Sequence, residues 1–190
     1  MHRLKAQIRK HLKTPEEEAI FNLGFHPNYK EWTESFGIFN AVKNHLPDLP
    51  LNDPSISVVN VGDGRTPRCG PIFAFYTKWK VWSVDPDSRV DNSRIRRQQK
   101  RFPQLANFNS VVSTIENFEA PRFDRLIIAA CHAHVTIESM LDSLKAKRRA
   151  LVVMPCCINQ EVVNNQMPDK SFEDPYVISP KRRINIWKRI

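Results

Sequence analysis

A glycine-containing turn follows an apolar run in the first half of the chain. The run SVVNV (57–61) is rich in β-branched residues and leads directly into Gly62, Asp63 and Gly64. Glycine adopts positive φ angles at little cost and lets a ligand approach the backbone closely. Asp85 follows about 20 residues later, the spacing at which an acidic side chain binds the two hydroxyls of a ribose. We therefore predict that this turn holds a ligand that contains a nucleoside.

Pro67 distinguishes between two versions of such a turn. The dinucleotide fingerprint G-x-G-x-x-G requires a glycine at this position, and a proline there obstructs a turn that binds pyrophosphate. A turn that binds S-adenosylmethionine has no phosphate to hold and tolerates the proline better. The sequence therefore favours S-adenosylmethionine over a dinucleotide.

Two later turns, ACHAH (130–134) and PCC (155–157), carry side chains that could act on a substrate or bind metal. They contain five soft metal ligands: Cys131, His132, His134, Cys156 and Cys157. Their spacing matches no common zinc motif, and buried cysteines after strands are common, so no metal site is predicted. His132 and His134 are the candidate general bases. For each histidine, the alternative is a hydrogen bond to a backbone carbonyl.

Basic residues outnumber acidic ones, with 29 Lys+Arg against 20 Asp+Glu and a formal net charge of +9. Such a charge attracts polyanions, among them nucleic acid. The residues predicted to contact nucleic acid flank Pro67 or lie on a basic helix at 93–102: Arg65, Arg68, Arg94, Arg97 and Arg101. For the helix, the alternative is an ordinary solvated face.

The elements that must position these residues alternate from residue 55 onward. Short apolar runs predict strands at 55–61, 80–87, 108–114, 123–131, 149–157 and 181–190. Helices are predicted at 69–79, 93–102 and 136–147, and residues 1–47 have a helical pattern. The alternation indicates an α/β fold with a mostly parallel central sheet of about six strands and helices on both faces. Residues 1–50 are predicted to form an N-terminal helical extension, and residues 51–190 the ligand-binding domain.

The expected location is the cytoplasm or the nucleus. No apolar run approaches the roughly 18 residues that a membrane span needs, so no membrane partner is expected. The basic start of the chain leads into TPEEE and not into an apolar stretch, which argues against a secretory signal. The four cysteines suit buried thiols in a reducing compartment.

The motifs in their order resemble a known family. The series NVGDGRT, VWSVDPD, STIENF, FDRLIIAACHAH and ALVVMPCC is similar to the Rossmann-like S-adenosylmethionine-dependent methyltransferases, over about residues 55–157. Within that superfamily, the ACHAH and PCC turns resemble a subgroup with LHAC-type and PCC turns, which includes RNA-modifying enzymes. The resemblance implies S-adenosylmethionine as cofactor and RNA as the expected substrate. It also implies these cofactor-binding residues: Asn60, Gly62, Asp63, Gly64, Asp85, Ile115, Glu116, Ala130 and Cys131.

Three positions depart from the family pattern and keep an alternative open. Asn60 and Val135 stand where the family usually has an acidic residue, and Thr66 stands where it has a third glycine. The alternative is a catalytically degenerate module that kept the fold and binds nucleic acid or a protein partner. A third hypothesis is an enzyme with a small-molecule or protein substrate, for which the positive charge is incidental.

Overall fold

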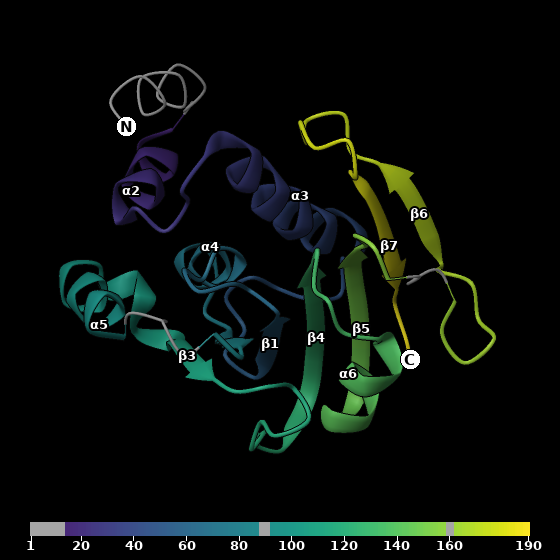
Figure 1. Cartoon of the computed structure of the whole chain (residues 1–190). Coiled ribbons are helices and arrows are strands. Elements are labelled where there is room, and N and C mark those ends of the chain that lie inside the picture. Colours follow the sequence, from purple (N-terminus) through teal and green to yellow (C-terminus); the bar gives the residue numbers. More distant parts are fainter. Residues whose placement is uncertain (1–13, 88–91, 159–161) are drawn as a thin grey trace.

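The structure is a computed structural model that describes residues 14–87, 92–158 and 162–190 (Figure 1). In this part of the chain, seven strands form one sheet in the order β3-β2-β1-β4-β5-β7-β6. Their bounds are Ile56–Val61 (β1), Lys80–Asp85 (β2), Phe108–Val112 (β3), Phe123–Cys131 (β4), Ala146–Met154 (β5), Lys170–Glu173 (β6) and Arg183–Trp187 (β7). The strands β1 to β5 are parallel, whereas β7 pairs antiparallel with both β5 and β6.

The strand order reverses between β1 and β4. The chain runs outward from β1 through β2 to β3 and then returns to the other side of β1 to form β4. In open parallel sheets, ligands bind at the carboxyl ends of the strands beside such a reversal. The turn after β1 therefore lies where a ligand is expected.

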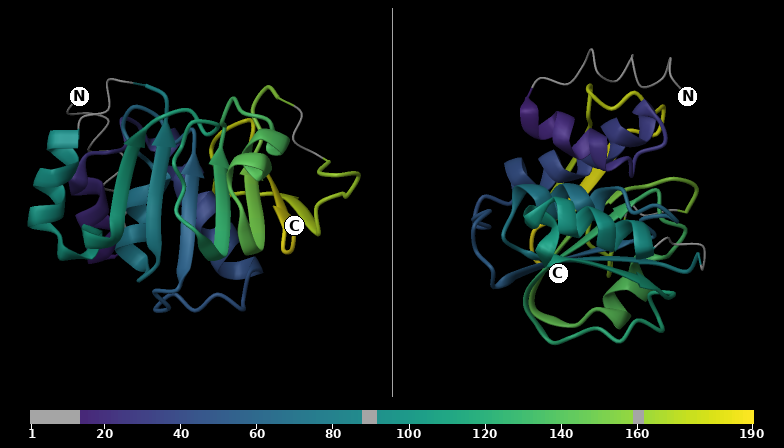
Figure 2. Two further views of the ribbon diagram at one scale, coloured as in Figure 1. Left: turned by 90° about the horizontal axis from the view of Figure 1, so that it is seen from below. Right: turned by 90° about the vertical axis from the view of Figure 1, so that its left-hand side faces the viewer.

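Helices cover both faces of the sheet, but unequally (Figure 2). Side chains of α2 (Pro15–Leu23), α3 (Tyr29–His45), α4 (Cys69–Tyr76) and α5 (Asn92–Arg101) belong to the apolar core on one face. The core on the other face includes α6 (Ile137–Ser143). This arrangement confirms the predicted fold class. No described helix is both long and apolar enough to cross a membrane.

Capping residues mark the ends of the helices in the amino-terminal part of the described chain. Thr14 caps α2 by accepting a hydrogen bond from the Glu17 N–H at 3.2 Å, and Gly24 ends this helix with a φ of 71°. Asn28 caps α3 through the Glu31 N–H at 2.9 Å. Both helices lie in the region that the sequence predicted as helical, while residues 1–13 of that prediction lie outside the described residues.

The structure differs from the predicted elements in the carboxyl-terminal part of the chain. The helix predicted at 136–147 ends at Ser143, and Ala146 and Lys147 already belong to β5. β5 ends at Met154 and not at residue 157, because Pro155 has no N–H to continue the ladder and the chain then bends at 156–158. Of the four thiols that were predicted to be buried, Cys69 is buried, Cys131 and Cys156 are half-buried, and Cys157 is exposed. The edge strand β6 was not predicted, because KSFE is too short and too exposed to show an apolar pattern.

His26 is a buried histidine with a low pKa. Its side chain packs edge-on against Trp32 at 4.9 Å between ring centroids, and both ring nitrogens are buried, near the backbone of Arg68. Burial, and to a smaller extent the charge of Arg68, lower the pKa of His26 from 6.5 to about 3. The folded protein therefore keeps this ring neutral at mildly acidic pH.

We expect His26 to make folding sensitive to acid. Below pH 6.5 the unfolded chain binds a proton at this residue and the folded chain does not, so the free energy of unfolding falls as the pH falls. Between pH 7 and pH 5 the loss should be about 2 kcal/mol. Urea unfolding of the wild type and of His26→Phe at both pH values measures it, since phenylalanine keeps the ring and cannot titrate. An equal pH effect in the two proteins would contradict the prediction.

Candidate functional site

The turn after β1 requires both of its glycines. Gly62 and Gly64 have φ angles of 64° and 82°, which side chains rarely adopt. A Cβ atom on Gly62 would lie only 2.9 Å from the Cβ atom of Ala133, in the turn after β4. The Gly62 N–H also donates to the Val84 carbonyl at 2.8 Å. The turns after β1 and β4 therefore pack directly against each other beside the strand reversal.

Asp85, at the end of β2, holds this turn in place. One carboxylate oxygen accepts a hydrogen bond from the Gly64 N–H at 2.8 Å, and the other accepts one from the Asp87 N–H at 2.9 Å. The side chain is half-buried. Because each carboxylate oxygen has two lone pairs, Asp85 retains capacity to accept two further hydrogen bonds.

Asp63 points away from the turn and into the protein. It accepts hydrogen bonds from the N–H groups of Cys69 and Gly70, at 2.8 and 3.0 Å, and from the Ser83 hydroxyl at 2.5 Å. Burial raises the pKa of Asp63, and these hydrogen bonds oppose the shift. Asp63 thus ties the amino end of α4 to β2, and these contacts lend no support to the predicted direct contact with a cofactor.

Asn60 and Cys131 lie on the α4 side of the sheet. Asn60 is buried, and its amide donates to the Trp82 carbonyl at 3.0 Å, while its Oδ1 atom has no hydrogen-bond partner among the described residues. The Cys131 thiol forms a hydrogen bond with Cys69, and this contact together with burial raises the pKa of Cys69. These side chains are thus engaged with the core around α4.

A pocket of about 360 Å³ opens at the carboxyl ends of β1 and β2, and we call it the turn pocket. Its walls come from 61–62, Val84, Pro86, 113–116, 134–136 and Ser139. Four predicted site residues line it: Gly62, Ile115, Glu116 and His134. Its volume lies within the range of small-molecule sites.

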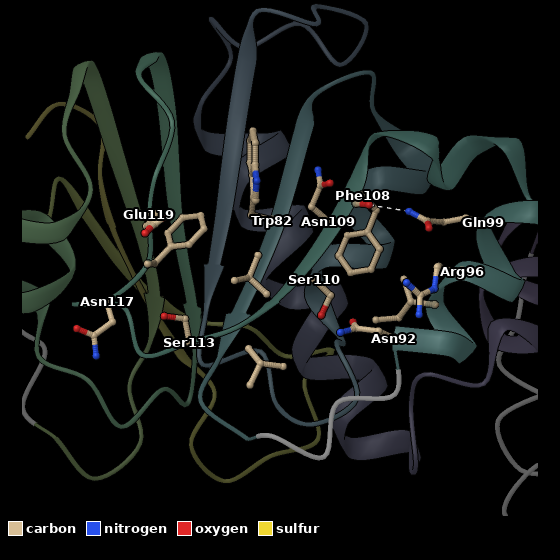
Figure 3. A pocket seen from close by; sticks show the side chains of 14 residues that line it. Trp82, Asn92, Arg96, Gln99, Phe108, Asn109, Ser110, Ser113, Asn117 and Glu119 are labelled. Carbon is tan, nitrogen blue, oxygen red and sulfur yellow. Dashed lines mark hydrogen bonds between the residues drawn. The ribbon is translucent and has the colours of Figure 1, made fainter.

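A second hollow of about 720 Å³ lies beside the edge strand β3, and we call it the edge pocket (Figure 3). Ser113 lines both pockets, so the 113–117 turn separates them. Arg96 of α5 and Trp82 of β2 also line the edge pocket. Arg96 belongs to the basic helix that was predicted as part of a phosphate-binding track, but the sequence of α5 alone does not show which of its arginines faces β3.

The two candidate histidines have different surroundings. His132, whose φ is 54°, contacts Glu34 of α3 through its Nε2 atom at 2.9 Å. Burial alone would raise the pKa of Glu34, but hydrogen bonds with His132, Lys30 and Ser179 outweigh it and lower that pKa from 4.5 to about 2. His132 is thus engaged by a buried carboxylate, and its free Nδ1 atom is buried. His134 is exposed and lines the turn pocket.

The predicted arginines divide into two groups. Arg68 pairs with Glu31 at 3.2 Å, and Arg94 donates to the Gly24 carbonyl and packs over the ring of Phe25. These two arginines connect the helical amino-terminal region to the rest of the protein. The remaining three are exposed on the surface: Arg65, Arg97 and Arg101.

Comparison with known proteins gives low similarity throughout. No protein-family model matches the sequence, and no curated protein matches it significantly. Among solved structures, a SAM-dependent methyltransferase from Aquifex aeolicus is 18% identical with a TM-score of 0.46, over 75% of this chain and 73% of that one. Geranyl diphosphate C-methyltransferase from Streptomyces coelicolor, solved with S-adenosyl-L-homocysteine, is 15% identical with a TM-score of 0.44, over 60% of this chain. The METTL16 MTase domain is 9% identical with a TM-score of 0.42, over 63% of this chain.

The chain spans 45% of the Streptomyces enzyme and 51% of the METTL16 domain. All three TM-scores are below 0.5. The function proposed below therefore depends on the residues of the site and not on these neighbours.

Proposed function

We propose that the protein is an S-adenosylmethionine-dependent methyltransferase. The observation that carries the proposal is the turn pocket, which lies at the strand reversal and is bordered by a glycine turn that Asp85 holds in place. Asp85 does not line the turn pocket, but it lies between Val84 and Pro86 of the pocket wall, and its spare lone pairs suit the two ribose hydroxyls. The buried side chain of Ile115, which lines the pocket, suits an adenine ring. The residues present therefore fit this cofactor.

Methyl transfer requires little of the protein beyond positioning the cofactor and the acceptor. S-adenosylmethionine supplies a methyl group on a positively charged sulfur. The chain must hold the acceptor in line with that group and exclude water, which accounts for much of the rate of such transfers. His134 is the candidate proton acceptor, because it is exposed on the rim of the turn pocket. His132 is better placed to fix the turn after β4 through Glu34.

Calorimetric titration with S-adenosylmethionine tests the proposal. We expect one binding site per chain. Absence of binding at millimolar cofactor would instead favour the alternative of a catalytically degenerate module. One observation favours that alternative: both carboxylate oxygens of Asp85 already accept backbone hydrogen bonds.

RNA is the substrate we propose, because exposed arginines lie near the site. Arg65 belongs to the turn after β1, and Arg96 lines the edge pocket next to the 113–117 turn. A single strand that passes these two residues could bring a nucleotide to the turn pocket. Net charge alone would also attract RNA, so the test must separate directed contacts from a diffuse field.

The salt dependence of RNA binding makes this separation. Each phosphate contact on a single strand contributes about 0.7 to the slope of log affinity against log salt, so Arg65→Ala with Arg96→Ala should reduce the slope by about 1.4. The matched control is Lys145→Ala with Lys147→Ala, which removes the same charge from residues that pair with Asp142 and Asp124. Equal effects of the two double variants in fluorescence anisotropy would mean that the charge acts only as a field.

A further inference from the structure

Three soft metal ligands meet where β4 and β5 end. The ligand atoms of His134, Cys156 and Cys157 all lie within 4.8 Å of one another, and His134 Nε2 is 3.7 Å from Cys157 Sγ. Both cysteines are free thiols. Cys156 is half-buried and the other two residues are exposed, so an ion from solvent can reach the group.

The backbone fixes this meeting point. Cys131 of β4 pairs with Met154 of β5, and the His132 N–H donates to the Met154 carbonyl at 2.9 Å, so the two strand ends lie side by side. Consecutive side chains of a strand point to opposite faces, but Cys156 and Cys157 lie in a bend after β5. Both thiols can therefore face His134.

We propose that His134, Cys156 and Cys157 bind a zinc ion. In a tetrahedral site with metal–sulfur bonds of about 2.3 Å and metal–nitrogen bonds of about 2.0 Å, the ligand atoms lie about 3.3–3.8 Å apart. The 3.7 Å contact already meets this requirement, and small side-chain rotations would bring the third atom into place. The Lys181 ammonium also donates a hydrogen bond to Cys156 Sγ at 3.8 Å, so this sulfur lies in a polar setting that an ion can enter.

Three protein ligands leave the fourth position of zinc open, which is the arrangement of catalytic and not of structural zinc sites. His134 also lines the turn pocket, so the open position lies at its rim. In the metal-bound protein, His134 would be a zinc ligand and would not be available as the proton acceptor. The ion would instead lower the pKa of a molecule bound at its open position, which would release its proton to solvent.

A second group of potential ligands, formed by Glu34, Cys131 and His132, is a weaker candidate. Glu34 is 2% exposed, and its carboxylate is already neutralised by Lys30 at 2.8 Å. A metal there would have to displace the ammonium group and enter the core. We therefore assign the ion to the group around Cys156.

Metal titration of the reduced, metal-free protein tests the proposal. Each chain should bind one cobalt ion. The absorption spectrum should then show the charge-transfer bands of cobalt–thiolate bonds and the visible bands of a tetrahedral site. Zinc affinity is then measured by competition with a coloured chelator. Each of Cys156→Ser, Cys157→Ser and His134→Ala should weaken zinc binding by roughly 100-fold or more, because each removes one of three protein ligands.

Cys131→Ser is the matched control, because it removes a cysteine of the second group, and it should leave zinc affinity unchanged. Loss of binding in Cys131→Ser alone would overturn the assignment. Absence of one-to-one binding in the wild type, or binding that none of the three ligand variants affects, would overturn the proposal. The titration contains no S-adenosylmethionine, so its outcome is independent of the proposed methyltransferase activity.

Discussion

Replacing Asp85 with alanine should weaken S-adenosylmethionine binding by about 1.5–3 kcal/mol, or roughly 10- to 150-fold. The carboxylate is the group we expect to accept hydrogen bonds from the ribose hydroxyls, and it also fixes the glycine turn through the Gly64 N–H. Asp85 lies between Val84 and Pro86, which line the turn pocket, so both losses occur beside that pocket. Calorimetric titration of the variant and of the wild type measures the difference.

Two further variants interpret this result. Asp85→Asn keeps one acceptor oxygen and should have an intermediate affinity. Asp124→Ala removes an acidic residue that is exposed at the start of β4 and should bind the cofactor as the wild type does. If Asp85→Ala bound S-adenosylmethionine with unchanged affinity, Asp85 would not be the ribose ligand and the proposed binding mode would fail.

Replacing Asp63 with alanine should lower the free energy of unfolding by about 2–4 kcal/mol. The substitution leaves the N–H groups of Cys69 and Gly70 and the Ser83 hydroxyl without their acceptor in a buried place. It also removes the link between the amino end of α4 and β2. Chemical unfolding followed by circular dichroism measures the change.

Asp142→Ala is the control for Asp63→Ala. Its side chain is 83% exposed and forms a surface ion pair with Lys145, so its loss should cost less than about 0.5 kcal/mol. A similarly small effect of Asp63→Ala would show that water replaces the hydrogen bonds of Asp63. The role of Asp63 in joining the amino end of α4 to β2 would then be rejected.

The local sequence was sufficient for the order of the helices and of every strand of the described chain except β6. Runs of β-branched residues located β1 to β5 and β7, and Thr14 and Pro15 located the start of α2. These signals can be read locally, because the backbone preference of β-branched side chains and the capping of a helix involve only a few consecutive residues. The same is true of Gly62 and Gly64, whose positive φ angles follow from the tight turn after β1.

Which side chains face a ligand was decided by tertiary structure. Asp63 lies between two predicted ligand-binding glycines, yet its carboxylate accepts hydrogen bonds from groups of α4 and β2. Arg68 and Arg94 occur in the same basic stretches as Arg65 and Arg97, yet they pair with groups of the amino-terminal region. The partners of Arg68 and Arg94 are far away in sequence, so no local pattern reports them.

The convergence of His134, Cys156 and Cys157 has the same origin. The sequence named all three as soft ligands, but their spacing matched no common motif, and no site was predicted. Their proximity depends on the pairing of β4 with β5 and on the bend after Met154. The sequence by itself determined most of the elements and the residue types at their ends. Strand pairing and helix packing decided which of these residues meet, because contacts between distant segments form only when the sheet assembles.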